Sequence, residues 1–157
     1  MHENTPEMTI ETIQVETLTR PGKNRRIVAK AREHEIVMDM KEEMMGDNAG
    51  PTPPELLAMS IGGCMVNIAR IMAEQKGKKL KDLQVSVSGP IDPSRAMGMQ
   101  SSNPTGFMGL SIRVKLETDL AAADLEAFRK ELMERCALCD TIASPTPLDI
   151  RFDLDCS

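Results

Sequence analysis

The residues best suited to do chemistry in this sequence of 157 residues are four cysteines: Cys64, Cys136, Cys139 and Cys156. A cysteine thiolate is a nucleophile and a metal ligand, and two thiols can be oxidised to a disulfide. Cys64 follows two glycines, whereas Cys136 and Cys139 form a Cys-x-x-Cys pair. These residue types and spacings indicate thiol redox chemistry or metal binding.

Composition narrows the class of protein and its partners. Hydrophobic residues make up 41% of the chain and charged residues 27%, as in an ordinary globular protein, and the length predicts a single domain over residues 1–157. The net charge is -5, and the aromatic residues are three Phe. A surface of this kind lacks a basic stripe for phosphates and rings for stacking bases, so we expect no nucleic acid partner.

Segment hydropathy predicts where the protein works. The N-terminal residues are polar and acidic, unlike a signal peptide. The most apolar stretch, Leu56 to Val66, is too short to span a bilayer. We therefore expect a cytoplasmic protein without a membrane partner. In that reducing compartment cysteines favour thiol chemistry or metal binding over structural disulfides.

The residues around Cys64 predict a long central helix. Thr52 can cap its start, two prolines fit its first turn, and Gly77 can end it after about Gln75. Residues three and four apart form its expected apolar face: Leu57, Ile61, Cys64, Ile68 and Ile71. Two interior glycines, Gly62 and Gly63, cost about 1.5–2 kcal/mol relative to alanine, which indicates close helix packing or room beside Cys64 for a second sulfur or a ligand.

Alternating apolar residues predict strands before and after this helix. A loop from Gly89 to Gly109 separates the two middle strands, and a turn at Pro21 to Asn24 interrupts the first strand region. The expected strands lie within residues 8–39, at 83–87, at 110–116 and at 148–154. With a second helix from near Asp119, this order predicts an α+β fold with a largely antiparallel sheet.

The second helix carries the Cys-x-x-Cys pair. Its expected apolar face is Leu125, Phe128, Leu132, Cys136 and Cys139. The pair lies at the far end of this helix, where the helix dipole disfavours a thiolate, so either cysteine is better suited to accept attack than to attack. Two other interpretations stay open: two core cysteines, or a zinc site completed by Cys156 and His34. Cys64 itself is either a small buried hydrophobe or a reactive thiol.

Four segments resemble motifs of the OsmC/organic hydroperoxide resistance (Ohr) superfamily, and the pattern is closest to its less characterised OsmC-like branch. Residues 53–64 resemble the P-x-E-L-L-x-x-x-x-G-x-C helix, and residues 136–142 resemble the C-P-V-S-x-T-L motif. Residues 32–36 and 50–53 resemble the strand and loop before the helix. The segments occur in family order, and the overall similarity extends from about Asn24 to Phe152.

The resemblance implies a fold, an assembly and a reaction. The implied fold has mostly antiparallel sheets wrapped around two long central helices in an intertwined homodimer, with sites at the interface. The implied reaction is thiol-dependent reduction of an organic hydroperoxide. Cys64 becomes a sulfenic acid, Cys136 resolves it to a disulfide, and a dithiol reductant restores both. This cycle requires no metal, flavin or haem.

Departures from the family motifs concern the groups around the two sulfurs. Ala137 replaces the proline of the second motif, and Cys139 stands where the family usually has serine. Glu55 lies one residue after the position of the family carboxylate. Arg25 or Arg26 could supply the loop arginine that lowers the thiol pKa. The alternative function is a dimer without peroxidase activity that binds a small apolar ligand or thiol adduct in the interface cleft.

Overall fold

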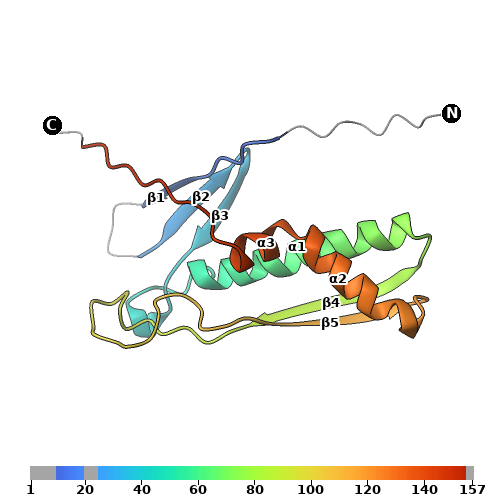
Figure 1. Cartoon of the computed structure of the whole chain (residues 1–157). Coiled ribbons are helices and arrows are strands. Elements are labelled where there is room, and N and C mark those ends of the chain that lie inside the picture. The colour runs from blue at the N-terminus through green and yellow to red at the C-terminus, as the bar shows by residue number, and fades with distance from the viewer. Residues whose placement is uncertain (1–9, 20–24, 155–157) are drawn as a thin grey trace. The chain divides into compact units, whose positions relative to one another are not determined.

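The computed structural model describes residues 10–19 and 25–154 of the chain (Figure 1). It contains two antiparallel sheets and three α-helices in these residues, which confirms the predicted α+β class. The chain forms two compact units, residues 1–56 and residues 57–157.

The first unit holds a three-stranded antiparallel sheet in the order β1-β2-β3. Its strands are β1 (Glu16–Thr19), β2 (Ile27–Ala31) and β3 (His34–Met38). Val28 and Met38 are its buried apolar residues among those described. The expected strands of this region are therefore present, while the turn expected at Pro21 to Asn24 lies outside the described residues.

A buried carboxylate organises the loop after β3. The Asp39 side chain is 1% exposed and accepts hydrogen bonds from the backbone N–H groups of Met40 (2.8 Å), Asp47 (3.1 Å) and Ala49 (3.1 Å). The bond from Ala49 does most to lower the pKa of Asp39, and burial opposes it. The other two bonds and the charge of Arg26 also favour the carboxylate. The loop, which includes the 3-10 helix η1 (Glu42–Met44), is thus folded around one charged group.

The central helix α1 (Pro53–Gln75) confirms the predicted boundaries. Its start is a capping box, in which Thr52 Oγ1 accepts from the N–H of Glu55 (3.4 Å) and Glu55 Oε2 accepts from the N–H of Thr52 (2.8 Å). Beyond its last turn Gly77 has a φ of 63°, a left-handed conformation that glycine adopts without steric cost.

A β-hairpin in the second unit confirms the two middle strands. β4 (Leu80–Ser88) pairs antiparallel with β5 (Ser111–Thr118), and Leu83 lies opposite Leu116. The intervening loop is tied together by Asp92, whose carboxylate accepts from Ser101 Oγ (2.6 Å) and Asn103 Nδ2 (2.9 Å). Within this loop Ile91 also forms an antiparallel bridge to Phe107.

The prediction of one continuous second helix is wrong, because the helix is interrupted at Cys136. The 3-10 helix η2 (Ala122–Asp124) leads into α2 (Leu125–Arg135), which ends before Cys136. Cys136 has the extended dihedrals φ -85° and ψ 104°, and a separate helix α3 (Ala137–Ala143) follows it. The spacing of apolar residues runs through the interruption, so periodicity alone could not reveal it.

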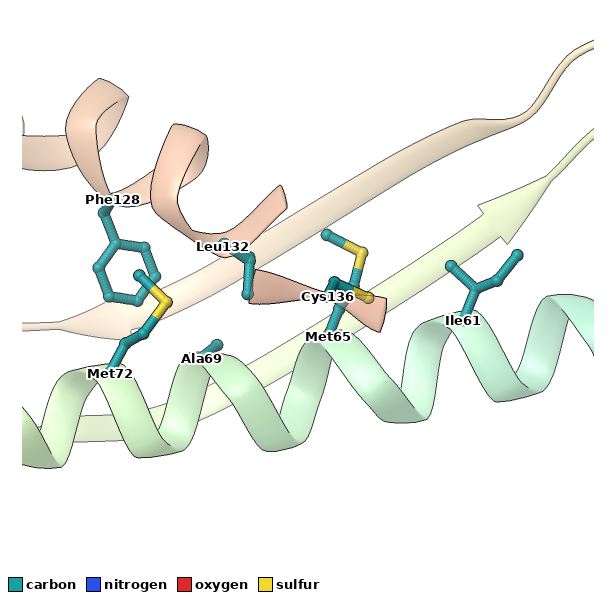
Figure 2. Packing of buried hydrophobic residues seen from close by; sticks show 7 residues of the cluster. All are labelled: Ile61, Met65, Ala69, Met72, Phe128, Leu132 and Cys136. Carbon is teal, nitrogen blue, oxygen red and sulfur yellow. The ribbon is translucent and has the colours of Figure 1, made fainter. Parts of the chain in front are cut away.

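The core of the second unit lies between α1, α2 and the β4–β5 hairpin. Figure 2 shows Phe128 facing Met72 and Cys136 next to Met65, with Leu132 and Ala69 between these contacts. The buried face of α1 is Ile61, Met65, Ala69, Met72 and Ala73. The expected face is therefore only partly correct: Ile61 is buried, whereas Leu57 and Ile71 are 42% and 41% exposed.

The strand expected at residues 148–154 does not form. Residues 145–154 have no regular secondary structure, and the four alternating apolar side chains are exposed: Leu148, Ile150, Phe152 and Leu154. A strand is stabilised by hydrogen bonds to a neighbouring strand and by burial of one face. Within residues 10–19 and 25–154 this segment has no such neighbour, so its sequence pattern alone does not make it a strand.

α1 is long and apolar enough to cross a membrane by length and composition, and an 18-residue window within it has a mean hydropathy of 1.6. The expectation based on the shorter run Leu56 to Val66 therefore does not carry over to the full helix. Core helices pass the same test, and one face of α1 packs against β4, β5 and α2, although only 28% of the window is buried.

The Asp39 loop gives a prediction about pH and stability. The folded pKa of Asp39 lies below its ordinary value of 3.8. Its carboxylate therefore stabilises the fold above that pH, and the contribution is lost as the pH falls toward the folded pKa. We expect Asp39→Asn to lower the urea midpoint at pH 7 and to flatten its decrease between pH 5 and 3 relative to wild type. Asp124→Asn is the control, because Asp124 is exposed and makes no side-chain cap at α2; equal losses in both variants would contradict the prediction.

Candidate functional site: a cluster of three thiols

Three cysteines from two elements meet in the second unit. Cys64 lies in the middle of α1, and Cys136 and Cys139 lie at the start of α3. Cys64 and Cys139 pack against the buried cluster that contains Cys136, and the three thiols shift one another's pKa. We call these residues the three-thiol cluster. Cys64 and Cys136, which the family resemblance pairs, thus belong to one cluster, and Cys139 joins them.

Packing and ion pairs around α2 hold Cys136 over α1. Leu132, one turn earlier, is 3% exposed in the core, and Cys136 is 0% exposed. At the end of α2, Arg135 Nη1 donates to Gln75 Oε1 at the end of α1 and to Glu131 Oε1, each at 2.9 Å. These contacts fix the point at which α2 stops and thus the position of the Cys136 sulfur.

The interruption at Cys136 reverses the expectation about the helix dipole. Cys136 is the N-cap residue of α3, so the Cys-x-x-Cys pair begins a helix rather than ending one. No side-chain hydrogen bond caps α3, but the nearby N–H groups of Cys139 and Leu138 lower the pKa of the Cys136 thiol, and those of Leu138 and Ala137 act in the same direction on the pKa of Cys64. Such donors at a helix start stabilise a thiolate.

One sequence signal could have indicated this helix start. Asp140 lies in the first turn of α3, where an acidic residue is favoured by the unpaired N–H groups and the helix dipole. In a continuous helix the same residue would lie in the last turn, where an acid is disfavoured. The charge pattern therefore contradicted the apolar periodicity.

The three thiols differ in their tendency to ionise. Burial raises the pKa of Cys64, and donation of its proton to Cys136 raises it further. Burial, the bond to Cys136 and the Cys136 charge raise the pKa of Cys139 to about 11. Burial also opposes ionisation of Cys136, but the N–H of Cys139, the two neighbouring thiols and the N–H of Leu138 outweigh it and lower its pKa. The cluster therefore loses its first proton at Cys136.

Exposure and ionisation do not favour the same sulfur. Cys136 holds the thiolate most readily but is fully buried, whereas Cys64 and Cys139 are half-buried. A reagent from solvent consequently meets Cys64 or Cys139 first. The accessible Cys64 thiol and the Cys136 thiolate are neighbours in the cluster. A proton can therefore move from Cys64 to Cys136 when Cys64 reacts.

The other predicted site residues belong to the first unit. Glu55 is in the first unit and caps α1, with a pKa lowered chiefly by the N–H and then by the hydroxyl of Thr52. Arg25 and Arg26 are exposed residues of the first unit, where the charge of Arg26 acts on Asp39. Their roles in catalysis stay predictions.

The remaining zinc candidates and the two glycines give no further site. His34 lies on β3, where its Nε2 is 3.3 Å from Glu33 Oε1, and Cys156 lies outside the described residues. No group of three or more potential ligands is arranged for a metal ion in the described part of the chain. A Cβ on Gly62 would make ordinary contacts with Val85 and Val87, so Gly62 faces the hairpin rather than another helix.

The fold and the three-thiol cluster can be compared with known proteins. The family described as OsmC-like protein matches residues 46–151, and the chain belongs to this family. No curated protein matches the chain. The comparison with solved structures agrees with the family assignment.

Three similar solved structures have the same fold. An OsmC-like protein from Mycoplasma pneumoniae is 16% identical with a TM-score of 0.70, and the alignment covers 86% of this chain and 89% of that one. The organic hydroperoxide resistance protein OsmC from Legionella pneumophila is 17% identical with a TM-score of 0.62, covering 86% and 91%. A protein of Vibrio cholerae described as an organic hydroperoxide resistance protein, with captopril bound in one of its active sites, is 18% identical with a TM-score of 0.54, covering 89% and 90%. At these identities the similarity shows the fold and not the activity.

The cluster predicts how its thiols titrate when Cys136 is removed. In Cys136→Ser the negative charge next to Cys139 and Cys64 is absent. We therefore expect the pKa of Cys139 to fall from about 11, and that of Cys64 to fall as well. The measurement is the ultraviolet thiolate absorbance against pH, with Cys156→Ser as the control. A Cys136→Ser curve that differs from wild type only by the loss of one high-pKa thiol would contradict the assignment.

Proposed function

We propose that the protein is a thiol-dependent peroxidase that reduces organic hydroperoxides to alcohols. The observation that carries this proposal is the packing of the half-buried Cys64 against the cluster that contains Cys136, whose pKa is lowered by its surroundings. Membership of the OsmC-like family and the names of two structural relatives support the substrate class. The overall reaction converts a hydroperoxide and two thiols into an alcohol, water and a disulfide.

In the first step Cys64 attacks the peroxide. Its proton moves to the Cys136 thiolate as the Cys64 sulfur forms a bond to the terminal peroxide oxygen and the O–O bond breaks. The alkoxide that leaves takes the proton from Cys136 and becomes the alcohol. Cys64 is then a sulfenic acid, and Cys136 is again a thiolate. This route activates Cys64 through its neighbour, although burial raises its own pKa.

In the second step Cys136 resolves the sulfenic acid. Its thiolate attacks the Cys64 sulfur, a disulfide forms, and hydroxide leaves and takes a proton from solvent to become water. The N–H groups at the start of α3 hold the sulfurs together during this step. An external dithiol, available in a reducing cytoplasm, returns the two cysteines to thiols, and the cycle needs no cofactor.

We also propose that the working unit is a homodimer. Leu57, Met59 and Ile71 on α1 are exposed by 41% or more, and so are the alternating apolar residues 148–154. Exposed large apolar side chains are often covered at an interface, and a second copy of the chain is the partner that the family resemblance implies. The single-domain organisation of residues 1–157 belongs to the same proposal.

The second candidate function is binding without peroxide reduction. The raised pKa of Cys64 favours it, because a protonated thiol is a poor nucleophile. The captopril in the Vibrio cholerae structure supports a ligand-binding site in a protein of this fold. Consumption of hydroperoxide separates the two functions.

Peroxide consumption tests the proposed reaction. We expect the reduced protein to consume cumene hydroperoxide with dithiothreitol as reductant, and Cys64→Ser to lose at least about a hundredfold of the rate, since the nucleophile is removed. In Cys136→Ser the sulfenic acid at Cys64 cannot be resolved internally and should be trapped by dimedone. Cys156→Ser serves as the control with unchanged rate. A wild-type rate no higher than that of Cys64→Ser would favour the binding function.

Light scattering tests the dimer. We expect twice the chain mass at micromolar concentration. Ile71→Lys places a charge in the proposed interface and should weaken dimerisation by at least about tenfold, equivalent to about 1.4 kcal/mol. Met99→Lys is the control, because Met99 is 57% exposed in the loop between β4 and β5. A monomeric wild-type mass would contradict the prediction.

A further inference from the structure

Cys139 belongs to the same cluster of sulfurs as Cys64. Cys136 is the N-cap residue of α3, Cys139 follows three positions later in its first turn, and Cys139 packs against the buried cluster that contains Cys136. Side chains three positions apart at a helix start lie on one face, with Cβ atoms about 5–6 Å apart. A small shift brings this spacing to the Cβ separation of a disulfide, about 3.5–4.5 Å.

We infer that Cys139 is a third redox thiol, which takes over the disulfide from Cys64 and stores it as Cys136–Cys139. The inference deepens the proposed function, because the peroxidase cycle supplies the initial Cys64–Cys136 disulfide. Cys136 is the shared partner of both bonds and lies between the two other thiols. Cys139 stands where the family usually has serine, so the family resemblance assigns it no role.

The exchange is a balanced thiol–disulfide isomerisation. The Cys139 thiolate attacks the Cys136 sulfur, the bond between Cys136 and Cys139 forms, and the bond between Cys136 and Cys64 breaks. Cys64 leaves as a thiolate and takes up the proton that Cys139 lost. No external oxidant or reductant is needed, because one disulfide replaces another.

The surroundings set the order of events. In the reduced cluster the Cys136 charge, in addition to burial, keeps Cys139 protonated. Once Cys136 is part of a disulfide this charge is absent, so the attacking thiolate forms more readily. The leaving Cys64 thiolate is stabilised by the N–H groups of Leu138 and Ala137, which already donate to its sulfur. Cys139 therefore becomes a nucleophile only after the peroxide has been reduced.

The exchange changes what solvent encounters. Cys64 returns to the thiol state before any reductant arrives, and the oxidising equivalent is held in the Cys-x-x-Cys pair. The half-buried sulfur of Cys139, rather than the fully buried Cys136, is then the atom that an external dithiol attacks.

Tryptic peptides distinguish the two disulfides directly. Cleavage after Lys41 and Arg70 releases Cys64 in the peptide 42–70, and cleavage after Arg135 and Arg151 releases Cys136 and Cys139 together in the peptide 136–151. A Cys136–Cys139 bond therefore leaves two separate peptides, with 136–151 lacking two hydrogens and Cys64 free for alkylation. A Cys64–Cys136 bond joins the two peptides.

The experiment oxidises the full-length protein with one equivalent of cumene hydroperoxide, quenches samples in acid over time, alkylates them and maps the peptides. We expect the joined peptides to appear first and then convert to the internal disulfide, faster at higher pH. In Cys139→Ser the joined peptides should persist, while Cys156→Ser should behave like wild type. Joined peptides as the stable product of the wild type would overturn the inference, and this arm does not depend on the folding of any variant.

A parallel oxidation with diamide separates the inference from the proposed function. Diamide forms disulfides without a peroxide step, and its products can equilibrate through the thiols. We expect the internal Cys136–Cys139 disulfide as the final product here too, and joined peptides would again overturn the inference. If diamide gives the internal disulfide while cumene hydroperoxide leaves all thiols reduced, the peroxidase proposal fails and the disulfide exchange stands.

Discussion

The structure of the site depends on the break between two helices at one buried sulfur. Cys136 lies where α2 ends and α3 begins, and the N–H groups of the first turn of α3 and the two neighbouring thiols lower its pKa. If the helix continued through Cys136, these N–H groups would bond to backbone carbonyls and could not reach either sulfur. Because of the interruption, the N–H groups at the start of α3 are free to stabilise the Cys136 thiolate in an apolar core.

The same interruption explains why an arginine is not the only means of activating Cys64. A buried thiol needs a positive charge, a dipole or a proton acceptor to react at neutral pH. In this chain backbone dipoles favour the charge on Cys136, and Cys136 in turn is positioned to accept the Cys64 proton. In the proposed reaction Cys136 would therefore both accept the Cys64 proton and resolve the sulfenic acid.

The elements of the fold that depend on local sequence patterns could be predicted from the sequence. The limits of α1 follow from the Thr52 cap, the prolines and Gly77, and the hairpin follows from strict alternation in β4 and β5. The inner face of α1 was harder to predict, because methionine and alanine at Met65 and Ala69 are less obvious core residues than the leucines and isoleucines that lie exposed. The break at Cys136 and the missing final strand depend on tertiary contacts, which periodicity does not encode.

The methionine-rich core has a consequence for durability. Met65 and Met72 lie in the same apolar cluster as Cys136. Their thioethers are therefore close to the thiols, but the two side chains are only 4% and 0% exposed. Conversion of either one to a sulfoxide would place a polar oxygen where no partner for it exists in the cluster, and would loosen the contact between α1 and α2. The near-complete burial of Met65 and Met72 therefore limits their oxidation by reagents in solvent.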